Sequence, residues 1–393
     1  MNHNFDEIIN RKNTNSLKYD FALRRGKPEG VLPLWVADMD FQAPSCVIDA
    51  LVEKSRHGVF GYSESGDDYF EALRNWFSSN LNWNVQPEWL TKTPGVVYAI
   101  SAAIRAFTSE GDAVLIQQPV YYPFTETITD NNRKFMVNQL RYSGGKYYID
   151  FDDFEGKIVK NNVRMFILCS PHNPVGRVWA EEELVRMGCI CLKYDVMVVA
   201  DEIHADFTYP GLKHLVFAGL SPEFADRTIT CTAPTKTFNL AGLQISNIFI
   251  SNRNIRNGFR QEINRTGYSQ VNIMGMIACK AAYIGGREWF EALKIYLSNN
   301  LAFVRSFLKE RLPKIKLVEP EGTYLVWLDF SGLELSDKDL DRLIVHKAGL
   351  WLDSGTMFGA GGEGFQRINI ACPLAVLEKA FNQLEKALSS CSC

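Results

Sequence analysis

Short apolar runs alternate with amphipathic, helix-like stretches through the first two thirds of the chain, from about residue 44 to residue 284. Short runs bounded by turn residues are typical of buried strands, and apolar positions that recur every three to four residues are typical of helices. This alternation indicates βαβ units and a mainly parallel sheet. The predicted strands are 113–118, 164–169, 196–200, 228–232 and 246–250, and the predicted helices include 45–56, 69–79, 96–107 and 181–194.

The pattern changes after Gly285 and Gly286, where one long helical stretch begins. The elements that follow mix helices and strands without βαβ alternation, which predicts a second, smaller α+β domain. They are a helix at 287–310, a strand at 323–329, a helix near 338–348, a strand near 367–370 and a final helix. We therefore expect three parts: an N-terminal segment, 1–43, packed against the small domain and the junction; a large α/β domain, 44–285; and a small α+β domain, 286–393.

The composition is that of a folded protein with a sizeable core, since 46% of the 393 residues are hydrophobic and 22% are charged. A net charge of −3 provides no large cationic surface, so we expect neither nucleic acid nor anionic lipid as a partner. The apolar runs are much shorter than the ~20 residues of a membrane span, and the polar start lacks a signal-peptide core. We therefore expect a cytoplasmic protein.

The nine cysteines include no Cys-x-x-Cys pair, and their number is odd. This argues against a disulfide framework and against a zinc site, so we expect buried thiols and no metal. Cys391 and Cys393 close a polar tail, which we interpret as a frayed terminus rather than a redox element.

Candidate chemistry follows three of the predicted strands. In an open parallel sheet the carboxyl ends of the strands face one crevice, so the residues that follow them are expected to converge. The segment after 164–169 contains Asn173, the segment after 196–200 contains Asp201 and His204, and the segment after 228–232 contains Lys236. Together they offer an amide, a carboxylate, an imidazole and an amine to one place.

Each of these residues also has a structural interpretation. Asp201 follows an apolar run and would need a cation such as a protonated heterocyclic nitrogen, or it could cap the next helix. Desolvation of Lys236 would leave a neutral amine able to attack an aldehyde, whereas most lysines are solvated surface charges. Asn173 could be an oriented amide or a turn residue, and His204 a site residue or a structural donor.

The segment 93–95, Thr-Pro-Gly, precedes the predicted helix 96–107. Free N–H groups at the start of a helix attract an anion such as phosphate, although a tight turn before an ordinary helix has the same sequence.

Taken together, these segments resemble the pyridoxal-phosphate enzymes of fold type I, aminotransferase class I/II. The resemblance covers nearly the whole chain, and its details are most similar to the cystathionine β-lyase branch of carbon–sulfur lyases. The segments that carry it are 33–41, 60–62, 93–97, 170–176, 201–204 and 233–242.

The resemblance implies a role for each candidate around pyridoxal 5'-phosphate. Lys236 would bind the cofactor aldehyde covalently, and Asp201 would pair with the pyridinium nitrogen. Asn173 and His204 would lie near the phenolic oxygen. Tyr121 would stack on the ring; the adjacent Tyr122 is the alternative, and a merely buried aromatic is the structural interpretation.

The resemblance also implies a phosphate site and a homodimer, because Tyr62 would reach the phosphate of the neighbouring subunit. Two positions depart from the broad aminotransferase pattern: Ala233 stands where serine is common, and Gln244 where arginine is common. The other implied phosphate ligands are Gly95, Val96, Val97 and Thr235.

Arg367 matches the family arginine that binds the substrate carboxylate, and its planar fork suits a bidentate pair, although a surface ion pair is the structural alternative. Trp35 and Ala37 are further implied substrate contacts.

The implied reaction is α,β-elimination, in which cystathionine, cysteine or S-substituted cysteines yield pyruvate, ammonia and a thiol, with the amine of Lys236 removing the Cα proton. The alternatives are a class I/II aminotransferase and a regulatory binding protein that retains the fold. The segments 35–41 and 233–236 favour the lyase.

Overall fold

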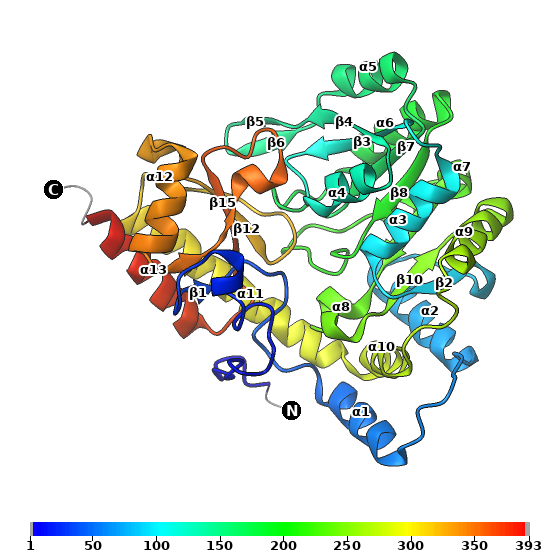
Figure 1. The fold of residues 1–393 in the computed structure, drawn as a ribbon, viewed down its shortest axis with the longest axis horizontal. Helices are drawn as coiled ribbons and strands as arrows, with labels where there is room; N and C mark the ends of the chain where they lie inside the picture. The colour runs from blue at the N-terminus through cyan, green and yellow to red at the C-terminus, as the bar shows by residue number, and fades with distance from the viewer. Residues whose placement is uncertain (1–2, 390–393) are drawn as a thin grey trace.

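The computed structural model describes residues 3–389, so the predicted frayed tail with Cys391 and Cys393 lies outside the described residues. Within this range, no helix combines the length and the apolar character that a membrane span requires. The structure has two parts that lie side by side, and each combines helices with a β-sheet (Figure 1). One part is built around a large sheet and the other around a small sheet.

The large sheet has seven strands in the order β2-β10-β9-β8-β7-β3-β4. Six of them run in one direction, and only β10 among these seven strands runs opposite, antiparallel to both β9 and β2. All five predicted strands are present, and the mainly parallel α/β architecture is confirmed. The strands are β2 (Leu90–Thr93), β3 (Ala113–Gln118), β4 (Lys134–Gln139), β7 (Met165–Cys169), β8 (Met197–Asp201), β9 (Thr228–Thr232) and β10 (Ser246–Phe249).

Helices cover both faces of this sheet because its strands are apolar on both sides. Val114 packs into the same cluster as α3 and α9, whereas the next residue, Leu115, packs into the cluster of α5 and α6. The four predicted helices of this region are present. The helices are α1 (Ser45–His57), α2 (Asp67–Leu81), α3 (Val96–Phe107), α4 (Pro123–Asp130), α5 (Phe151–Asn161), α6 (Glu181–Lys193), α7 (Pro222–Asp226), α8 (Pro234–Thr237), α9 (Arg253–Arg265) and α10 (Ile273–Gly285).

The small sheet has the order β11-β12-β15-β14 and is antiparallel throughout. Every element predicted after Gly286 is present, and the helix near 338–348 ends in a wider π-type turn, Leu343–Lys347. The elements are α11 (Arg287–Arg311), β11 (Lys316–Val318), β12 (Leu325–Asp329), α12 (Asp337–Arg342), β14 (Asp353–Ser354), β15 (Phe365–Asn369) and α13 (Leu374–Ser389).

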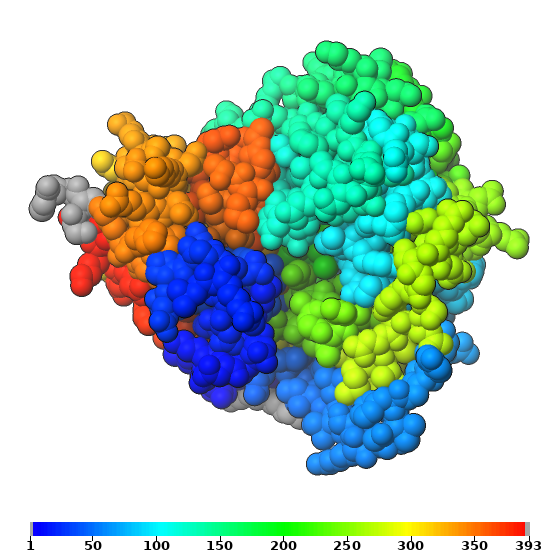
Figure 2. Space-filling view, in the orientation of Figure 1, coloured from blue at the N-terminus to red at the C-terminus, as the bar shows by residue number. Residues whose placement is uncertain are grey.

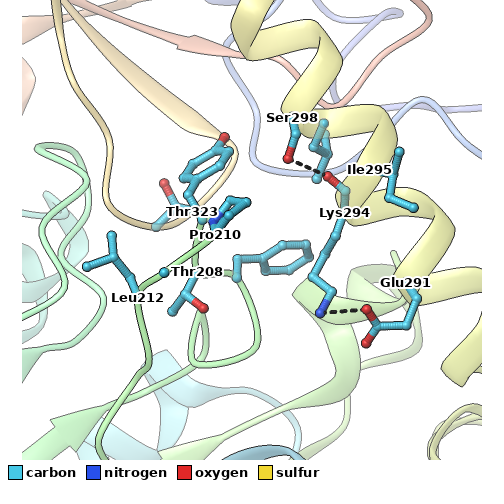
Figure 3. A pocket seen from close by; sticks show the side chains of 12 residues that line it. Thr208, Pro210, Leu212, Glu291, Lys294, Ile295, Ser298 and Thr323 are labelled. Atoms are coloured by element: carbon cyan, nitrogen blue, oxygen red, sulfur yellow. Dashed lines mark hydrogen bonds and ion pairs between the residues drawn. The ribbon is translucent and has the colours of Figure 1, made fainter.

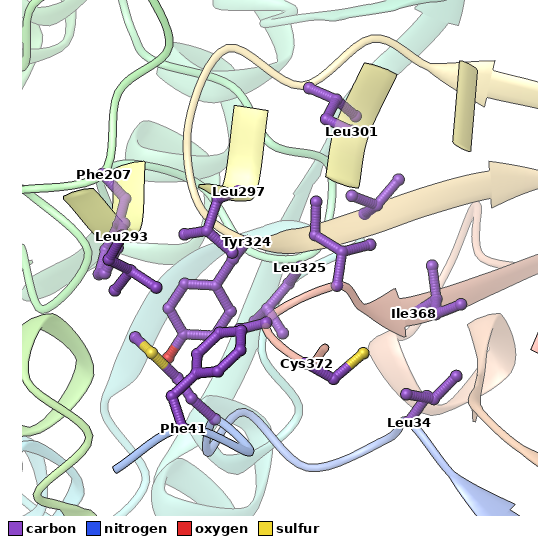
Figure 4. Close-up of a cluster of buried hydrophobic side chains, with 14 of the residues drawn as sticks. Leu34, Phe41, Phe207, Leu293, Leu297, Leu301, Tyr324, Leu325, Ile368 and Cys372 are labelled. Carbon is purple, nitrogen blue, oxygen red and sulfur yellow. The ribbon is translucent and has the colours of Figure 1, made fainter. Parts of the chain in front are cut away.

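The N-terminal segment lies against the small sheet. Strand β1 (Leu32–Pro33) pairs in parallel with β13 (Leu350–Trp351), and the blue N-terminal surface adjoins the orange and red C-terminal surface in Figure 2. Below it, Leu34 and Phe41 join the buried cluster of α11 and β12 shown in Figure 4. Each such side chain contributes about 1.5–3 kcal/mol on burial. This packing therefore fixes the N-terminal segment against the small sheet.

Candidate active site

The loops after β7, β8 and β9 start at one edge of the large sheet. Cys169 is paired with Asp201, and Asp201 with Cys231, so these three strands end side by side. Strand β2, at the edge of the sheet next to β10, ends at Thr93, which is paired with Ser246. Helix α3 starts two residues after Pro94. The antiparallel β10 therefore still leaves the start of α3 at the same edge.

Asp201 is a buried carboxylate with little compensation from the protein. It is 5% exposed, and its Oδ1 accepts a hydrogen bond from the N–H of Ile203 at 3.1 Å. Among the described residues it has no ion-pair partner within 4.0 Å. Burial raises the pKa of Asp201 to about 7, and the opposing effects of the Ile203 bond and of the Lys236 charge are smaller. The site therefore suits a bound cation or a ring N–H donor.

Lys236 lies on α8, a helix of only four residues that needs support from other elements. Thr237, the residue after Lys236, anchors this helix, because its hydroxyl donates to Asp206 at 2.6 Å. Asp206 is held in turn by a hydrogen bond from Trp76 at 3.0 Å. The Nζ of Lys236 donates to the carbonyl of Ala37 at 3.1 Å. Desolvation lowers the pKa of Lys236 to about 8, so a neutral amine is accessible near neutral pH.

Arg367 joins three parts of the chain. Its guanidinium donates to Asn173 Oδ1 and to the carbonyl of Trp35, each at 2.9 Å, and forms an ion pair with Asp353. Arg367 is 3% exposed, so the alternative of a surface ion pair is wrong. Burial raises the pKa of Asp353 despite the adjacent Arg367. The charged form of this buried carboxylate is therefore stabilised only while Arg367 stays in place as its partner.

His204 and Tyr121 complete the crevice. His204 is buried, and its Nδ1 has no hydrogen-bond partner among residues 3–389. Burial lowers the pKa of His204 to about 3, so the ring is neutral. The N–H of Tyr121 donates to the carbonyl of Asn173 at 3.0 Å, and the ring of Tyr122 lies 5.5 Å from that of Tyr121. Burial also raises the pKa of Tyr121, so its hydroxyl remains protonated.

The first turn of α3 keeps its N–H groups available, because its N-cap residue, Gly95, has no side chain to accept from them. The φ of Gly95 is 177°, which is extended backbone open to any residue, and Val96 and Val97 form the first turn. Thr235 lies half-buried in α8. Tyr62 differs from all of these residues: it is 98% exposed on the loop between α1 and α2, and within the described part of the chain it makes no hydrogen bond to the site.

Two residues at the site were not among the sequence candidates. Asp353 lies on a two-residue strand directly opposite Arg367, and Tyr324 donates its hydroxyl to the carbonyl of Ala37 at 2.8 Å. A short polar strand and a single tyrosine carry no local signal of these contacts. Trp35 contributes its carbonyl, while its indole stacks on Trp351 at 4.4 Å.

A separate pocket lies between the loop 207–212 and helix α11 (Figure 3). Its volume is about 330 Å³, and Lys294 pairs with Glu291 on its wall. None of the candidate residues lines it. Within residues 3–389, no cluster of three or more His, Cys, Asp or Glu side chains is arranged to hold a metal ion.

Residues 29–384 match the family described as aminotransferase class I and II, and the chain belongs to this family. It is 44% identical to cystathionine beta-lyase PatB of Bacillus subtilis over 98% of this chain and 100% of PatB, and 31% identical to protein MalY of Escherichia coli over 98% of both. The structure of cystalysin from Treponema denticola, which contains a pyridoxal 5'-phosphate cofactor, matches with a TM-score of 0.96 and 39% identity over 100% of both chains. These matches confirm the expected fold type I architecture.

Proposed function

We propose that the chain is a pyridoxal-phosphate-dependent carbon–sulfur β-lyase that converts cystathionine, cysteine or S-substituted cysteines to pyruvate, ammonia and a thiol. The observation that carries the proposal is the full-length 44% identity to PatB, a cystathionine beta-lyase. The C-S lyase of Staphylococcus hominis, crystallised with bound cofactor, also supports it, with 33% identity and a TM-score of 0.92 over 99% of both chains. An aminotransferase of Thermococcus litoralis is less similar, at 26% identity.

The crevice fits pyridoxal phosphate on three counts. The buried carboxylate of Asp201 has no ion-pair partner in the described part of the chain and suits a protonated ring nitrogen. The unpartnered Nδ1 of buried His204 leaves a polar group for the cofactor. The low pKa of Lys236 makes a nucleophilic amine available for an aldehyde. When bound, the cofactor supplies that aldehyde and an electron-withdrawing ring that stabilises negative charge at the substrate Cα.

The side chains divide the remaining work. Arg367, oriented by Asn173 and Asp353, binds the substrate carboxylate with its planar fork. Asp201 would pair with the ring nitrogen and keep it protonated. The amine of Lys236 accepts the Cα proton, after which the thiolate leaves from Cβ. Ala37 and Trp35 would border the substrate, Tyr121 would stack on the cofactor ring, and Asn173 with His204 would lie near its phenolic oxygen.

The phosphate is assigned to the first turn of α3, at Gly95, Val96 and Val97, with the hydroxyl of Thr235. We assign the last phosphate contact to Tyr62 of a second subunit in a homodimer. The exposure of Tyr62 supports this, since Val59 and Phe60 beside it are also more than half exposed and give the loop an apolar surface that suits a partner chain.

Mixed dimers test the assignment of Tyr62. A dimer of one Lys236→Ala chain and one Tyr62→Ala chain has one intact site if Tyr62 acts across the interface, and none if it acts within its own chain. Random assembly on co-expression makes half of the dimers mixed, so we expect about one quarter of wild-type activity. Recovery no higher than that of the two separate variants would contradict the assignment.

Turnover of L-cystathionine tests the reaction itself. We expect the purified protein, supplied with pyridoxal phosphate, to release pyruvate without any added keto acid, because elimination returns the cofactor unchanged. Pyruvate is measured with lactate dehydrogenase. Turnover that needs a keto acid acceptor and forms no pyruvate would identify an aminotransferase instead.

We also propose the division into 1–43, 44–285 and 286–393, supported by the separate large and small sheets. We propose a cytoplasmic location, supported by the free state of the seven described cysteines, since thiols persist in reducing compartments.

A further inference from the structure

The N-terminal segment passes the site as an extended chain whose carbonyl groups are held by side chains of the small sheet and its preceding loop. No strand pairs with residues 35–38, so these side chains take the place of a sheet partner. The bonds run from Arg367 to the carbonyl of Trp35 (2.9 Å), from Asn369 to those of Val36 (2.6 Å) and Asp38 (2.7 Å), and from Tyr324 to that of Ala37 (2.8 Å).

The Ala37 carbonyl also accepts a bond from Lys236 Nζ at 3.1 Å, and the Asp38 carbonyl accepts a second bond from Lys18 at 3.4 Å. A carbonyl oxygen has two lone pairs, and here one serves Tyr324 and the other Lys236. The Lys236 amine is thereby linked, through one oxygen atom, to Tyr324 on the small-sheet side. Among the described residues, this amine makes no other hydrogen bond.

Tyr324 is suited to hold that oxygen in a fixed place. Its side chain is 0% exposed, and burial raises the pKa of its hydroxyl, so the hydroxyl remains a donor across the working pH range. The ring packs edge-on against Phe207 at 4.9 Å and His204 at 6.0 Å. Figure 4 shows the Tyr324 ring enclosed by the apolar cluster, with its hydroxyl at one end.

We propose that Tyr324 is a positioning residue for Lys236: through the Ala37 carbonyl it fixes where the ε-amine rests whenever this amine is not bound to the cofactor. This inference rests on the proposed function, in which the released amine removes the Cα proton. In that step the C–H bond breaks, its electron pair stays with Cα, and the proton joins Nζ. An amine that rests in one place meets the proton in a reactive geometry more often than a mobile one.

Tyr324→Phe keeps the ring and removes only the bond to Ala37. In the cofactor-loaded enzyme we expect kcat to fall about tenfold and the KM for L-cystathionine to stay within about twofold, because binding by Arg367 is retained. We expect a larger kinetic isotope effect with substrate deuterated at Cα, because proton removal becomes slower relative to the other steps. Cofactor affinity should not change.

The cofactor-free protein gives a second readout that does not depend on activity. Acetic anhydride acylates the neutral amine of Lys236, and mass spectrometry follows its rate against pH. Without the Tyr324 hydroxyl the Ala37 carbonyl can turn away from Nζ, which weakens a bond that favours the charged amine. The midpoint of the rate profile should therefore move to lower pH in Tyr324→Phe.

Tyr147→Phe is the matched control, since Tyr147 is equally buried and its hydroxyl accepts a bond from Trp327 at 3.0 Å, away from Lys236. We expect a similar loss of thermal stability and no change in the isotope effect or the acylation midpoint. If Tyr324→Phe behaves like Tyr147→Phe, the inference is overturned and Tyr324 is only a structural tether.

3-Fluorotyrosine at position 324 keeps the shape and a hydroxyl, so it should retain wild-type kcat even if Tyr324→Phe folds poorly. A loss of kcat equal to that of Tyr324→Phe would also overturn the inference. Wild-type protein that makes no pyruvate would refute the proposed function, whereas the acylation arm would still test Tyr324.

Discussion

Replacing Lys236 with Ala is expected to lower turnover of L-cystathionine by more than about 10⁴-fold, because the variant loses both the covalent attachment of the cofactor and the base for the Cα proton. The remaining contacts, Asp201 and the start of α3, are retained, so pyridoxal phosphate should still bind without a covalent bond. Borohydride reduction followed by peptide mass spectrometry should label residue 236 in the wild type and no residue in the variant.

Lys294→Ala is a suitable control for this prediction. Lys294 pairs with Glu291 on α11, on the wall of the separate pocket, and among the described residues it forms no ion pair with the site. We expect full activity and wild-type labelling in this variant. Turnover above about 1% of wild type in Lys236→Ala, or borohydride labelling of another lysine in the wild-type protein, would be incompatible with the assigned role.

The convergence of Asn173, Asp201 and Lys236 could be predicted from the sequence because it depends on local features. Each residue follows a short apolar strand, and neighbouring parallel strands end at one edge of the sheet. The antiparallel direction of β10 was harder to predict, since it depends on the connection from β9. That connection contains only α8 and a short 3-10 turn, Ala241–Leu243, and does not cross back over the sheet.

Contacts between distant segments could not be derived from the sequence in the same way. The bond from Tyr324 to Ala37 joins residues 287 positions apart, and it depends on where the N-terminal segment packs. Trp35, which the resemblance implies as a substrate contact, also holds Arg367 with its main-chain oxygen, a contact that any residue could provide. Asp353 became a partner of Arg367 through strand register, which has no local sequence signature.

Arg367→Ala is expected to affect both substrate binding and stability. Loss of two charge-assisted hydrogen bonds to the substrate carboxylate, each worth about 1.5–3 kcal/mol, should lower kcat/KM by about 100-fold or more, mainly through KM. The same change leaves Asp353 buried without its ion-pair partner, which should lower the free energy of unfolding by about 3–5 kcal/mol. Steady-state kinetics and urea unfolding measure the two effects separately.

The pH dependence and a double variant separate these two causes. Without Arg367, the already raised pKa of Asp353 should rise further, so the folded state binds a proton that the unfolded chain releases. The stability deficit of Arg367→Ala should therefore shrink as the pH falls from 7 towards 5. Arg367→Leu combined with Asp353→Leu removes both charges and should regain most of the stability but none of the substrate affinity, because the carboxylate still lacks its partner. Recovery of KM in the double variant would show that Arg367 only supports the fold. A stability deficit in Arg367→Ala that does not change with pH would show that Asp353 carries no uncompensated charge.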